Sequence, residues 1–294
     1  MSYEHINTNI ELTGEQLPKI IVPPPGPKSK ELGEELIKYE SKGVSSIAIG
    51  KFPIVWDKAK GSNITDVDGN IYIELTAGFT VAITGHTNSR IVEAIKNQAE
   101  KMIHAQGAIN PNVPRIELAR KLAEITPGDI QKCIFLSTGA EAIELSLKTA
   151  RLYTGKRTVV AFHGGFHGKT YGALSVTSRN FYREQADSYM SGTTHVPYPY
   201  CYRCPFGDTR DTCGLRCVSY LEYVLDEPSS GIGDVAALIL EPIQGHEGVI
   251  VPPEGFLKEI RRICDERDIL MITDEIITGF GRTGAFFAVN HENV

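Results

Sequence analysis

Short apolar runs alternate with amphipathic stretches along the second half of the chain. The apolar runs predict strands at 133–136, 158–162, 236–240 and 269–272, and the amphipathic stretches predict helices at 141–153 and 256–267. Apolar residues fill most positions of each run, as expected for strands that are covered on both faces. The alternation predicts an α/β fold with a mostly parallel sheet and flanking helices.

The first part of the chain follows a different pattern. Residues 1–28 are polar and then proline-rich, which is typical of an extended arm that is not packed. A short helix is predicted at 31–42, and a strand, a turn at Asp68-Gly69 and a second strand are predicted within 52–75. Two more helices follow, one with its apolar face formed by Ile91, Ala94, Ile95, Ala99, Met102 and Ile103, and one at 116–125.

Composition and charge narrow the possible functions. The chain of 294 residues is 41% hydrophobic and 22% charged, with a net charge of −6 and no basic run, which argues against nucleic acid as a main partner. No apolar run reaches the roughly 20 residues that span a membrane, and the first residues lack the features of a signal peptide. Six cysteines in a chain of this length are typical of a reducing compartment, so we expect a cytoplasmic location.

Polar residues and glycines follow the predicted strands. The turn Ser137-Thr138-Gly139-Ala140 precedes a helix, so its backbone N–H groups and the helix dipole favour a phosphate, although an ordinary helix cap also fits. The glycines around Phe166 and His167 allow a flat ring to approach closely. Glu241 directly follows an apolar strand, so it must be nearly buried and must have a partner.

Two acids, Asp274 and Glu275, follow the last predicted strand, and glycines at 279, 281 and 284 come next. Ligands of open α/β sheets bind outside the carboxyl ends of the strands. A carboxylate at this place is suited to hold a positive charge on a bound cofactor. The plainer interpretation is a solvated acidic turn.

Together these stretches resemble the class III pyridoxal-phosphate-dependent aminotransferases, such as the 4-aminobutyrate, ornithine and acetylornithine enzymes. The resemblance rests on Asp274-Glu275-Ile276 with the Gly-Phe-Gly-Arg-Thr-Gly run at 279–284, on Glu241-Pro-Ile-Gln-Gly, and on the two glycine-containing turns. It implies the fold type I large domain, incomplete, at 76–294. It also implies that residues 1–75, with the arm, helix and hairpin, belong in part to the small domain, whose C-terminal portion is absent.

The resemblance also implies a role for each site residue. Asp274 would pair with the protonated pyridine nitrogen of pyridoxal 5'-phosphate and keep the ring an electron sink. Phe166 would stack on the ring with His167 beside it, and Glu241 would line the pocket. The other cofactor-binding residues would be Ser137, Thr138, Gly139 and Ala140 at the phosphate, and Ile276 and Ile277 after Asp274. No metal is expected among the site residues.

Two positions depart from the family pattern. Members with small substrates commonly continue Glu-Gly-Gly where this chain has His246-Glu247-Gly248, so a specificity switch that uses that glutamate is in doubt. Ile277 stands where many members have a Gln near the phenolic oxygen of the cofactor. Both departures bear on the choice of substrate.

The family holds its cofactor on a lysine that also moves the proton. That lysine lies on a strand after the Asp-Glu pair, which places it beyond Val294, whereas Lys169 and Lys258 precede the pair. We therefore expect the 294-residue chain to lack the catalytic lysine and the carboxylate-binding arginine of the small domain.

Four cysteines form two close pairs, Cys201 with Cys204 and Cys213 with Cys217. The first pair has the spacing of zinc ligands and the second comes near it. Free thiols or a facultative disulfide are preferred here, because the chemistry requires no metal and the pairs lie in a long insertion between strands. Cys133 and Cys264 lie on apolar faces and are expected in the core.

The predicted function is transfer of an amino group from an amino acid or ω-amino acid, such as 4-aminobutyrate, to a 2-oxo acid. The resemblance implies a homodimer with the active site at the interface, without nucleic acid or membrane. Amino-acid racemases and epimerases of the same family would use the same residues, and this alternative stays open. Two non-enzymatic alternatives are a cofactor-binding or dimerising subunit that ends at Val294 and a metal-stabilised interaction module at 201–217.

Overall fold

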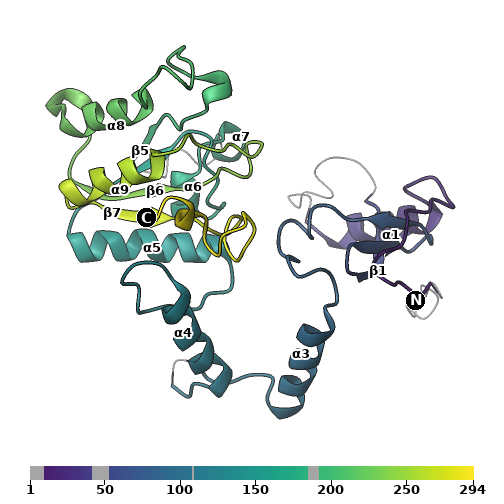
Figure 1. Ribbon diagram of the computed structural model, residues 1–294. Coiled ribbons are helices and arrows are strands. Elements are labelled where there is room, and N and C mark those ends of the chain that lie inside the picture. Colours follow the sequence, from purple (N-terminus) through teal and green to yellow (C-terminus); the bar gives the residue numbers. More distant parts are fainter. Residues whose placement is uncertain (1–9, 42–52, 108, 185–191) are drawn as a thin grey trace. The chain divides into compact units, whose positions relative to one another are not determined.

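A computed structural model describes residues 10–41, 53–107, 109–184 and 192–294 (Figure 1). Contacts within the chain divide it into two compact units, residues 1–111 and 112–294. The predicted domain boundary after residue 75 stays a prediction.

The first unit contains a small antiparallel sheet. Helix α1 spans Pro27–Tyr39 and begins earlier than predicted. Strands β1 (Trp56–Lys60), β2 (Asn63–Asp66) and β3 (Ile71–Ile73) follow in the order β1-β2-β3. The Asp68-Gly69 turn between β2 and β3 is confirmed, with Gly69 at φ 92°, where a residue with a side chain is strained. The predicted pair of strands in this region is therefore a three-stranded sheet.

The arm before α1 is extended as predicted, but it is bound to this sheet. Oδ1 of Asn70 accepts the N–H groups of Ile21 (2.8 Å) and Val22 (3.0 Å). Lys19 exchanges two backbone hydrogen bonds with Ile71. The prediction that the arm is not packed is therefore wrong for residues 19–22, because a buried asparagine side chain supplies an acceptor that strand periodicity does not reveal.

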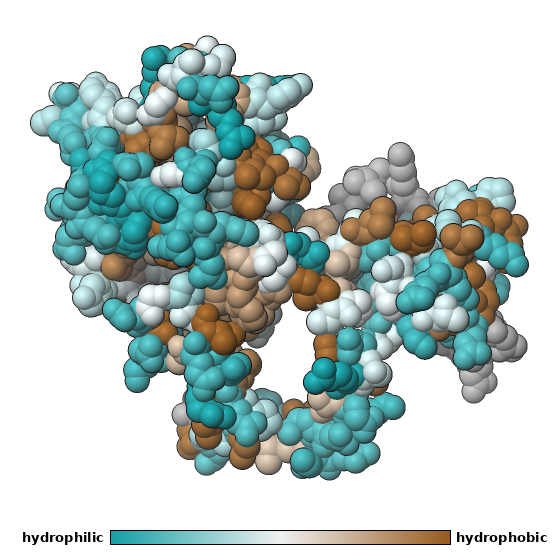
Figure 2. Space-filling model, in the orientation of Figure 1, coloured by the Kyte–Doolittle hydropathy of each residue, from teal (hydrophilic) through white to brown (hydrophobic). Residues whose placement is uncertain are grey.

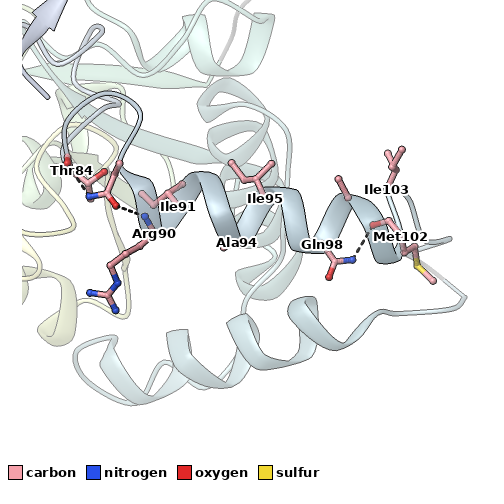
Figure 3. Close-up of a pocket in the computed structure, with 10 residues that line it drawn as sticks. Thr84, Arg90, Ile91, Ala94, Ile95, Gln98, Met102 and Ile103 are labelled. Carbon is pink, nitrogen blue, oxygen red and sulfur yellow. Dashed lines mark hydrogen bonds between the residues drawn. The ribbon is translucent and has the colours of Figure 1, made fainter. Parts of the chain in front are cut away.

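Helix α3 (Ser89–Lys101) carries the predicted apolar face, and in this unit that face is exposed. Ile91, Ala94, Ile95 and Met102 line one open groove along the helix, together with Ile103 just after it (Figure 3). Ile95 is 63% and Ile103 91% exposed. Hydrophobic surface is visible at several other places on the molecule (Figure 2). The sequence therefore predicted the face correctly and gave no sign of its exposure.

The second unit is a parallel α/β sheet, as predicted. Strands β4 (Thr158–Phe162), β5 (Thr193–Val196), β6 (Val235–Leu240) and β7 (Leu270–Thr273) lie in the order β5-β4-β6-β7, and every pair is parallel. The longer helices of this unit are α4 (Val113–Ile125), α5 (Gly139–Thr154), α8 (Arg216–Asp226) and α9 (Phe256–Glu266). The shorter ones are α6 (Tyr171–Val176), α7 (Asn180–Arg183), and the 3₁₀ turns η3 (Cys201–Arg203), η4 (Pro228–Ser230) and η5 (Ala288–His291).

The two faces of this sheet have separate cores. Alternate residues of a strand point to opposite faces. Val159 of β4 and Ile239 of β6 therefore pack with α5 and α6, whereas Val160 and Leu238 pack with α8 and α9. Figure 1 shows α5 on one side of the sheet and α8 and α9 on the other. All six residues of β6 are buried, as expected for a central strand covered on both sides.

One predicted strand is absent. Residues 133–136 form neither helix nor strand, with Ile134 67% and Leu136 44% exposed. An extended apolar segment becomes a strand only when a neighbour takes up its backbone hydrogen bonds, and the sheet of the described chain ends at β7. Cys133 is consequently exposed, contrary to the prediction that it is in the core, whereas Cys264 is buried as predicted.

Within the described ranges, none of the helices combines the length and the apolar character that crossing a membrane requires.

The core under α9 generates a stability prediction. Phe256 is fully buried, and its ring lies 5.8 Å from that of Phe162 and 5.3 Å from that of Tyr198. Phe256→Ala should lower the free energy of unfolding by about 3–5 kcal/mol through lost burial and a cavity. Tyr153→Ala, at an aromatic residue 80% exposed on α5, should change it by less than about 0.5 kcal/mol. Urea unfolding followed by circular dichroism measures both, and equal effects would contradict this account of the core.

Candidate active site

The carboxyl ends of β4, β6 and β7 meet at one edge of the parallel sheet. Leu240 pairs with Thr273, so the residues that follow them, Glu241 and Asp274, start side by side. The N–H of Asp274 donates to the carbonyl of Leu240 (2.8 Å), which continues the pairing by one residue. The predicted site residues therefore gather at the place where open α/β sheets bind ligands.

Asp274 forms a buried pair with His167. Nδ1 of His167 lies 2.8 Å from Oδ2 of Asp274, and the two residues are 3% and 6% exposed. Oδ1 of the same carboxylate accepts the N–H of Ile276 at 3.1 Å. Because an ionised carboxylate only accepts hydrogen bonds, Nδ1 of His167 carries the proton. The solvated acidic turn is thus wrong for Asp274.

His167 is fixed by the loop on which it lies. Its N–H donates to Oγ1 of Thr177 (2.9 Å), and that hydroxyl donates in turn to the carbonyl of Gly168 (3.0 Å). Nε2 of His167 is buried and has no partner in the part of the chain that the structure describes. The imidazole is therefore held through its backbone and Nδ1, and its second nitrogen remains available.

Glu241 is 3% exposed and holds two loops together. Its Oε1 accepts the N–H of Phe166 at 2.9 Å, and its Oε2 accepts the N–H of Gly245 at 3.0 Å. Burial raises the pKa of this carboxyl above its usual value, although the two N–H groups and His167 oppose the shift. The predicted burial and the need for a partner are both confirmed.

The turn before α5 is a helix cap. Thr138 is the N-cap, and its Oγ1 accepts the N–H of Glu141 (3.1 Å). The carboxylate of Glu141 accepts the N–H groups of Ser137 (2.8 Å) and Thr138 (3.1 Å). This reciprocal arrangement is a capping box. The N–H groups of Gly139 and Ala140, in the first turn of α5, have no acceptor within the helix and remain for an anion.

Three glycines let the loops of the site touch. A Cβ on Gly139 would lie 2.7 Å from Cδ1 of Ile276, and one on Gly245 would lie 2.8 Å from Cδ1 of Ile277. A Cβ on Gly168 would lie 2.8 Å from that of Ala140. Real side chains do not come this close, so the start of α5 touches the loops after β4 and β7, and the loop after β6 touches the loop after β7. These segments carry all the predicted site residues, and the roles of those residues stay a prediction: Ser137 to Ala140, Phe166, His167, Glu241, Asp274, Ile276 and Ile277.

Sequence reasoning missed an aromatic group beside Phe166. The hydroxyl of Tyr182 lies 2.9 Å from Nε2 of His246, and the ring of His246 meets that of Phe166 edge-on at 4.6 Å. The Tyr182 ring also contacts Phe166, at 5.5 Å. Burial lowers the pKa of His246 and so favours its neutral form. The neutral ring can accept a hydrogen bond from the hydroxyl of Tyr182. His246 was noticed as a departure, but no local pattern marks Tyr182. The capping box, by contrast, was readable in Thr138-Gly-Ala-Glu141.

Comparisons with known proteins identify the family of this chain. The sequence profile described as aminotransferase class-III matches residues 45–294. An acetylornithine aminotransferase of Methanopyrus kandleri is 42% identical over 244 residues, which cover 83% of this chain and 57% of that protein. A leucine/methionine racemase of Thermococcus litoralis is 40% identical, covering 82% of this chain and 54% of that protein.

A solved structure shares the fold. The (S)-enantioselective omega-transaminase of Thermomicrobium roseum superimposes with a TM-score of 0.82 at 33% identity, over 90% of this chain and 61% of that one. The chain thus spans between half and two thirds of the length of these relatives. The family profile, the two relatives and the shared fold establish that the chain belongs to the class III aminotransferases.

Proposed function

We propose that the protein carries out pyridoxal-phosphate-dependent transamination between an amino acid or ω-amino acid, such as 4-aminobutyrate, and a 2-oxo acid. The observation that supports this most strongly is the buried Asp274–His167 pair, which lies at the end of β7 beside the N-terminus of α5. The buried carboxylate can hold a cation, and the neighbouring helix N-terminus can hold an anion. Pyridoxal phosphate carries both charges, on its ring nitrogen and its phosphate.

Pyridoxal phosphate is the cofactor of the family, and it supplies an electron sink when its ring nitrogen is protonated. Asp274 would hold that nitrogen. Each of its oxygens accepts one protein hydrogen bond, from His167 or from Ile276, and a carboxylate oxygen has room for another. His167 would fix the orientation of the carboxylate, so that Asp274 keeps the ring proton in place.

The phosphate would bind at the start of α5. The N–H groups of Gly139 and Ala140 and the positive end of the helix dipole are the donors that remain there. The exposed hydroxyls of Ser137 and Thr138 add two more polar groups. The N–H groups of Ser137 and Thr138 would not contribute, because Glu141 already accepts them.

The remaining residues would shape the pocket. Phe166 would stack on the ring, held in place by Tyr182 and His246. Ile276 and Ile277 would flank the ring with apolar contacts. Both oxygens of Glu241 are already occupied by N–H groups, which supports a positioning role for this residue at the edge of the pocket.

We propose that the lysine that holds the cofactor and moves the proton follows Val294 in the reading frame, since the chain spans 57% and 54% of the two curated relatives. We also propose a cytoplasmic homodimer. The free thiols of the six cysteines and the exposed apolar face of α3 support this.

A racemase or epimerase is the second candidate. The leucine/methionine racemase of Thermococcus litoralis is nearly as similar as the aminotransferase relative. Ile277 cannot donate a hydrogen bond to the cofactor, and it packs against Gly245. With one enantiomer of an amino acid and no oxo acid, a racemase forms the opposite enantiomer, whereas a transaminase converts the amino acid only when an acceptor is added.

The first prediction concerns the lysine. Protein from the uninterrupted reading frame should take up pyridoxal phosphate with visible absorbance, and borohydride should fix the pyridoxyl group to a lysine after Val294. Peptide mass spectrometry identifies the modified residue. No fixed cofactor, or a natural stop codon after Val294, would refute the catalytic proposal and favour the non-catalytic, cofactor-binding alternative.

The second prediction concerns Asp274. Asp274→Asn should weaken binding of pyridoxal phosphate about 10- to 100-fold, because it removes a charge-assisted hydrogen bond of about 1.5–3 kcal/mol. The matched control is Asp268→Asn, an exposed acid just before β7. Equilibrium binding measured by fluorescence, with circular dichroism to check folding, gives both affinities. Equal affinities of the two variants would exclude Asp274 as the partner of the ring.

The third prediction concerns Glu241 and pH. Its pKa is raised above 4.5 by burial, so the folded protein holds the proton more tightly than the unfolded chain. The protonated carboxyl of Glu241 therefore stabilises the folded state. This contribution to the free energy of unfolding is fully present below pH 4.5, and it is lost as the pH rises through the pKa that Glu241 has in the folded protein. The unfolding free energy of the wild type, relative to Glu241→Gln, should therefore fall as the pH is raised from about 4.5 towards 7. Urea unfolding across this range tests it, and parallel curves would contradict a buried carboxyl with a raised pKa.

A further inference from the structure

Helix α6 follows the loop that carries His167, and a carboxylate from α5 holds its start. Oε1 of Glu144 accepts hydrogen bonds from the hydroxyl of Thr170 (2.6 Å) and from the N–H groups of Gly172 (2.7 Å) and Ala173 (3.2 Å). These N–H groups lie in the first turn of α6, where a helix supplies no acceptor of its own. Glu144 therefore caps α6 from a neighbouring helix.

Gly172 leaves open the space that this carboxylate occupies. A Cβ at this position would lie 2.1 Å from Oε2 of Glu144 and 2.8 Å from its Cδ. The backbone at Gly172 is helical, so the glycine serves to leave room and not to adopt a left-handed conformation. Because glycine weakens a helix relative to alanine, this position sacrifices helix stability to let Glu144 approach the backbone.

The other end of α6 holds His167. Thr177 is the C-cap residue of α6 and is fully buried. Its Oγ1 accepts the N–H of His167 (2.9 Å) and lies 3.0 Å from the carbonyl oxygen of Gly168. The imidazole of His167 in turn lies 2.8 Å from the carboxylate of Asp274. Hydrogen bonds and one short helix thus connect Glu144 of α5 with Asp274 after β7.

Packing fixes the same loop against α5. A Cβ at Gly168 would lie 2.8 Å from the Cβ of Ala140 and 2.9 Å from that of Ala173, so the loop passes closely between the first turn of α5 and α6. Ala173 and Val176 of α6 are fully buried, in the core that also contains Ile143 of α5. A shift of α6 would therefore open this core and also break the hydrogen bonds at the start of the helix.

We propose that Glu144 and Thr177 are positioning residues for the Asp274–His167 pair, an inference that rests on the function proposed above. Glu144 holds the start of α6 on α5, and Thr177 holds His167 on the end of α6. Neither residue would touch the cofactor, because each acts through His167. The start of α5 also presents the N–H groups for the phosphate, so one helix would set the separation between the phosphate and the ring nitrogen of the cofactor.

Two variants and a matched control test Thr177. Thr177→Val removes the hydroxyl and keeps the branched side chain, whereas Thr177→Ser keeps the hydroxyl. The control is Thr154→Val, at the far end of α5 from the site. The hydroxyl of Thr154 also accepts an N–H, from Lys156 (3.1 Å), and donates to a carbonyl four residues earlier, that of Ala150 (2.8 Å). The control therefore loses the same kind of hydrogen bonds without a link to His167.

Protein from the uninterrupted reading frame is measured first without cofactor. NMR of histidine-labelled protein should show a slowly exchanging Nδ1–H of His167, assigned by its loss in His167→Gln. We expect this signal to be lost or broadened in Thr177→Val and to be retained in Thr177→Ser and Thr154→Val. The affinity for pyridoxal phosphate, measured by fluorescence, should then be about 10-fold weaker in Thr177→Val than in Thr154→Val, which corresponds to the loss of one ordinary hydrogen bond.

Glu144 has its own pair of variants. Glu144→Ala removes the acceptor, whereas Glu144→Gln keeps an amide oxygen that can accept the same hydrogen bonds. We expect Glu144→Ala to lose the imidazole signal and about 10-fold in affinity for pyridoxal phosphate, and Glu144→Gln to retain both. If Glu144→Ala does not fold, Gly172→Ala replaces it, because the added methyl group displaces the same carboxylate while alanine favours the helix.

The outcomes separate this inference from the proposed function. A wild type that binds no pyridoxal phosphate would refute the proposed function, and the imidazole signal would still decide whether Thr177 and Glu144 hold His167. The positioning roles would be overturned by a wild type without this signal, or by an unchanged signal in Thr177→Val and in the variant used for Glu144. Affinities of those variants equal to that of Thr154→Val, with a wild type that binds the cofactor, would overturn them as well.

Discussion

Two carboxylates buried at the ends of adjacent parallel strands determine how the loops of this site are arranged. A carboxylate without partners costs several kcal/mol when it leaves water, so the chain must bring donors to it. Glu241 obtains N–H groups from the loops after β4 and β6, and Asp274 obtains the imidazole of His167 from the loop after β4. The loop at 162–170 therefore serves both acids.

Close contact between glycines and isoleucines is the second constraint. Ile276 and Ile277 occupy the space that side chains at Gly139 and Gly245 would require. This gives a physical reason for an isoleucine at 277: it fills the gap beside Gly245 with apolar contact, where a longer amide would need both a partner and more room. The same residue that departs from the family pattern thus contributes to the packing of the site.

The sequence predicted the structure best where the chemistry of a residue allows few structural environments. A buried acid after an apolar strand needs a partner, so the burial of Glu241 could be predicted from its neighbours alone. The alternation of strands and helices likewise predicted the parallel sheet.

Prediction failed where the outcome depends on distant residues. Residues 133–136 have the composition of a strand, but the described chain gives them no neighbour, and strand pairing is not a local property. Tyr182 approaches His246 through the fold, and the sequence around it shows nothing unusual.

The helix cap at α5 shows how a structural role and a binding role share one turn. Glu141 accepts two N–H groups that an anion could otherwise use, and its negative charge lies at the same helix end. It therefore opposes a phosphate by charge, while it fixes the turn that presents the N–H groups of Gly139 and Ala140. A turn organised before the anion arrives loses less conformational entropy when it binds. Because the repulsion and the ordering act in opposite directions, the affinity of this turn for phosphate depends on how far solvent screens Glu141, which lies at the exposed edge of the helix.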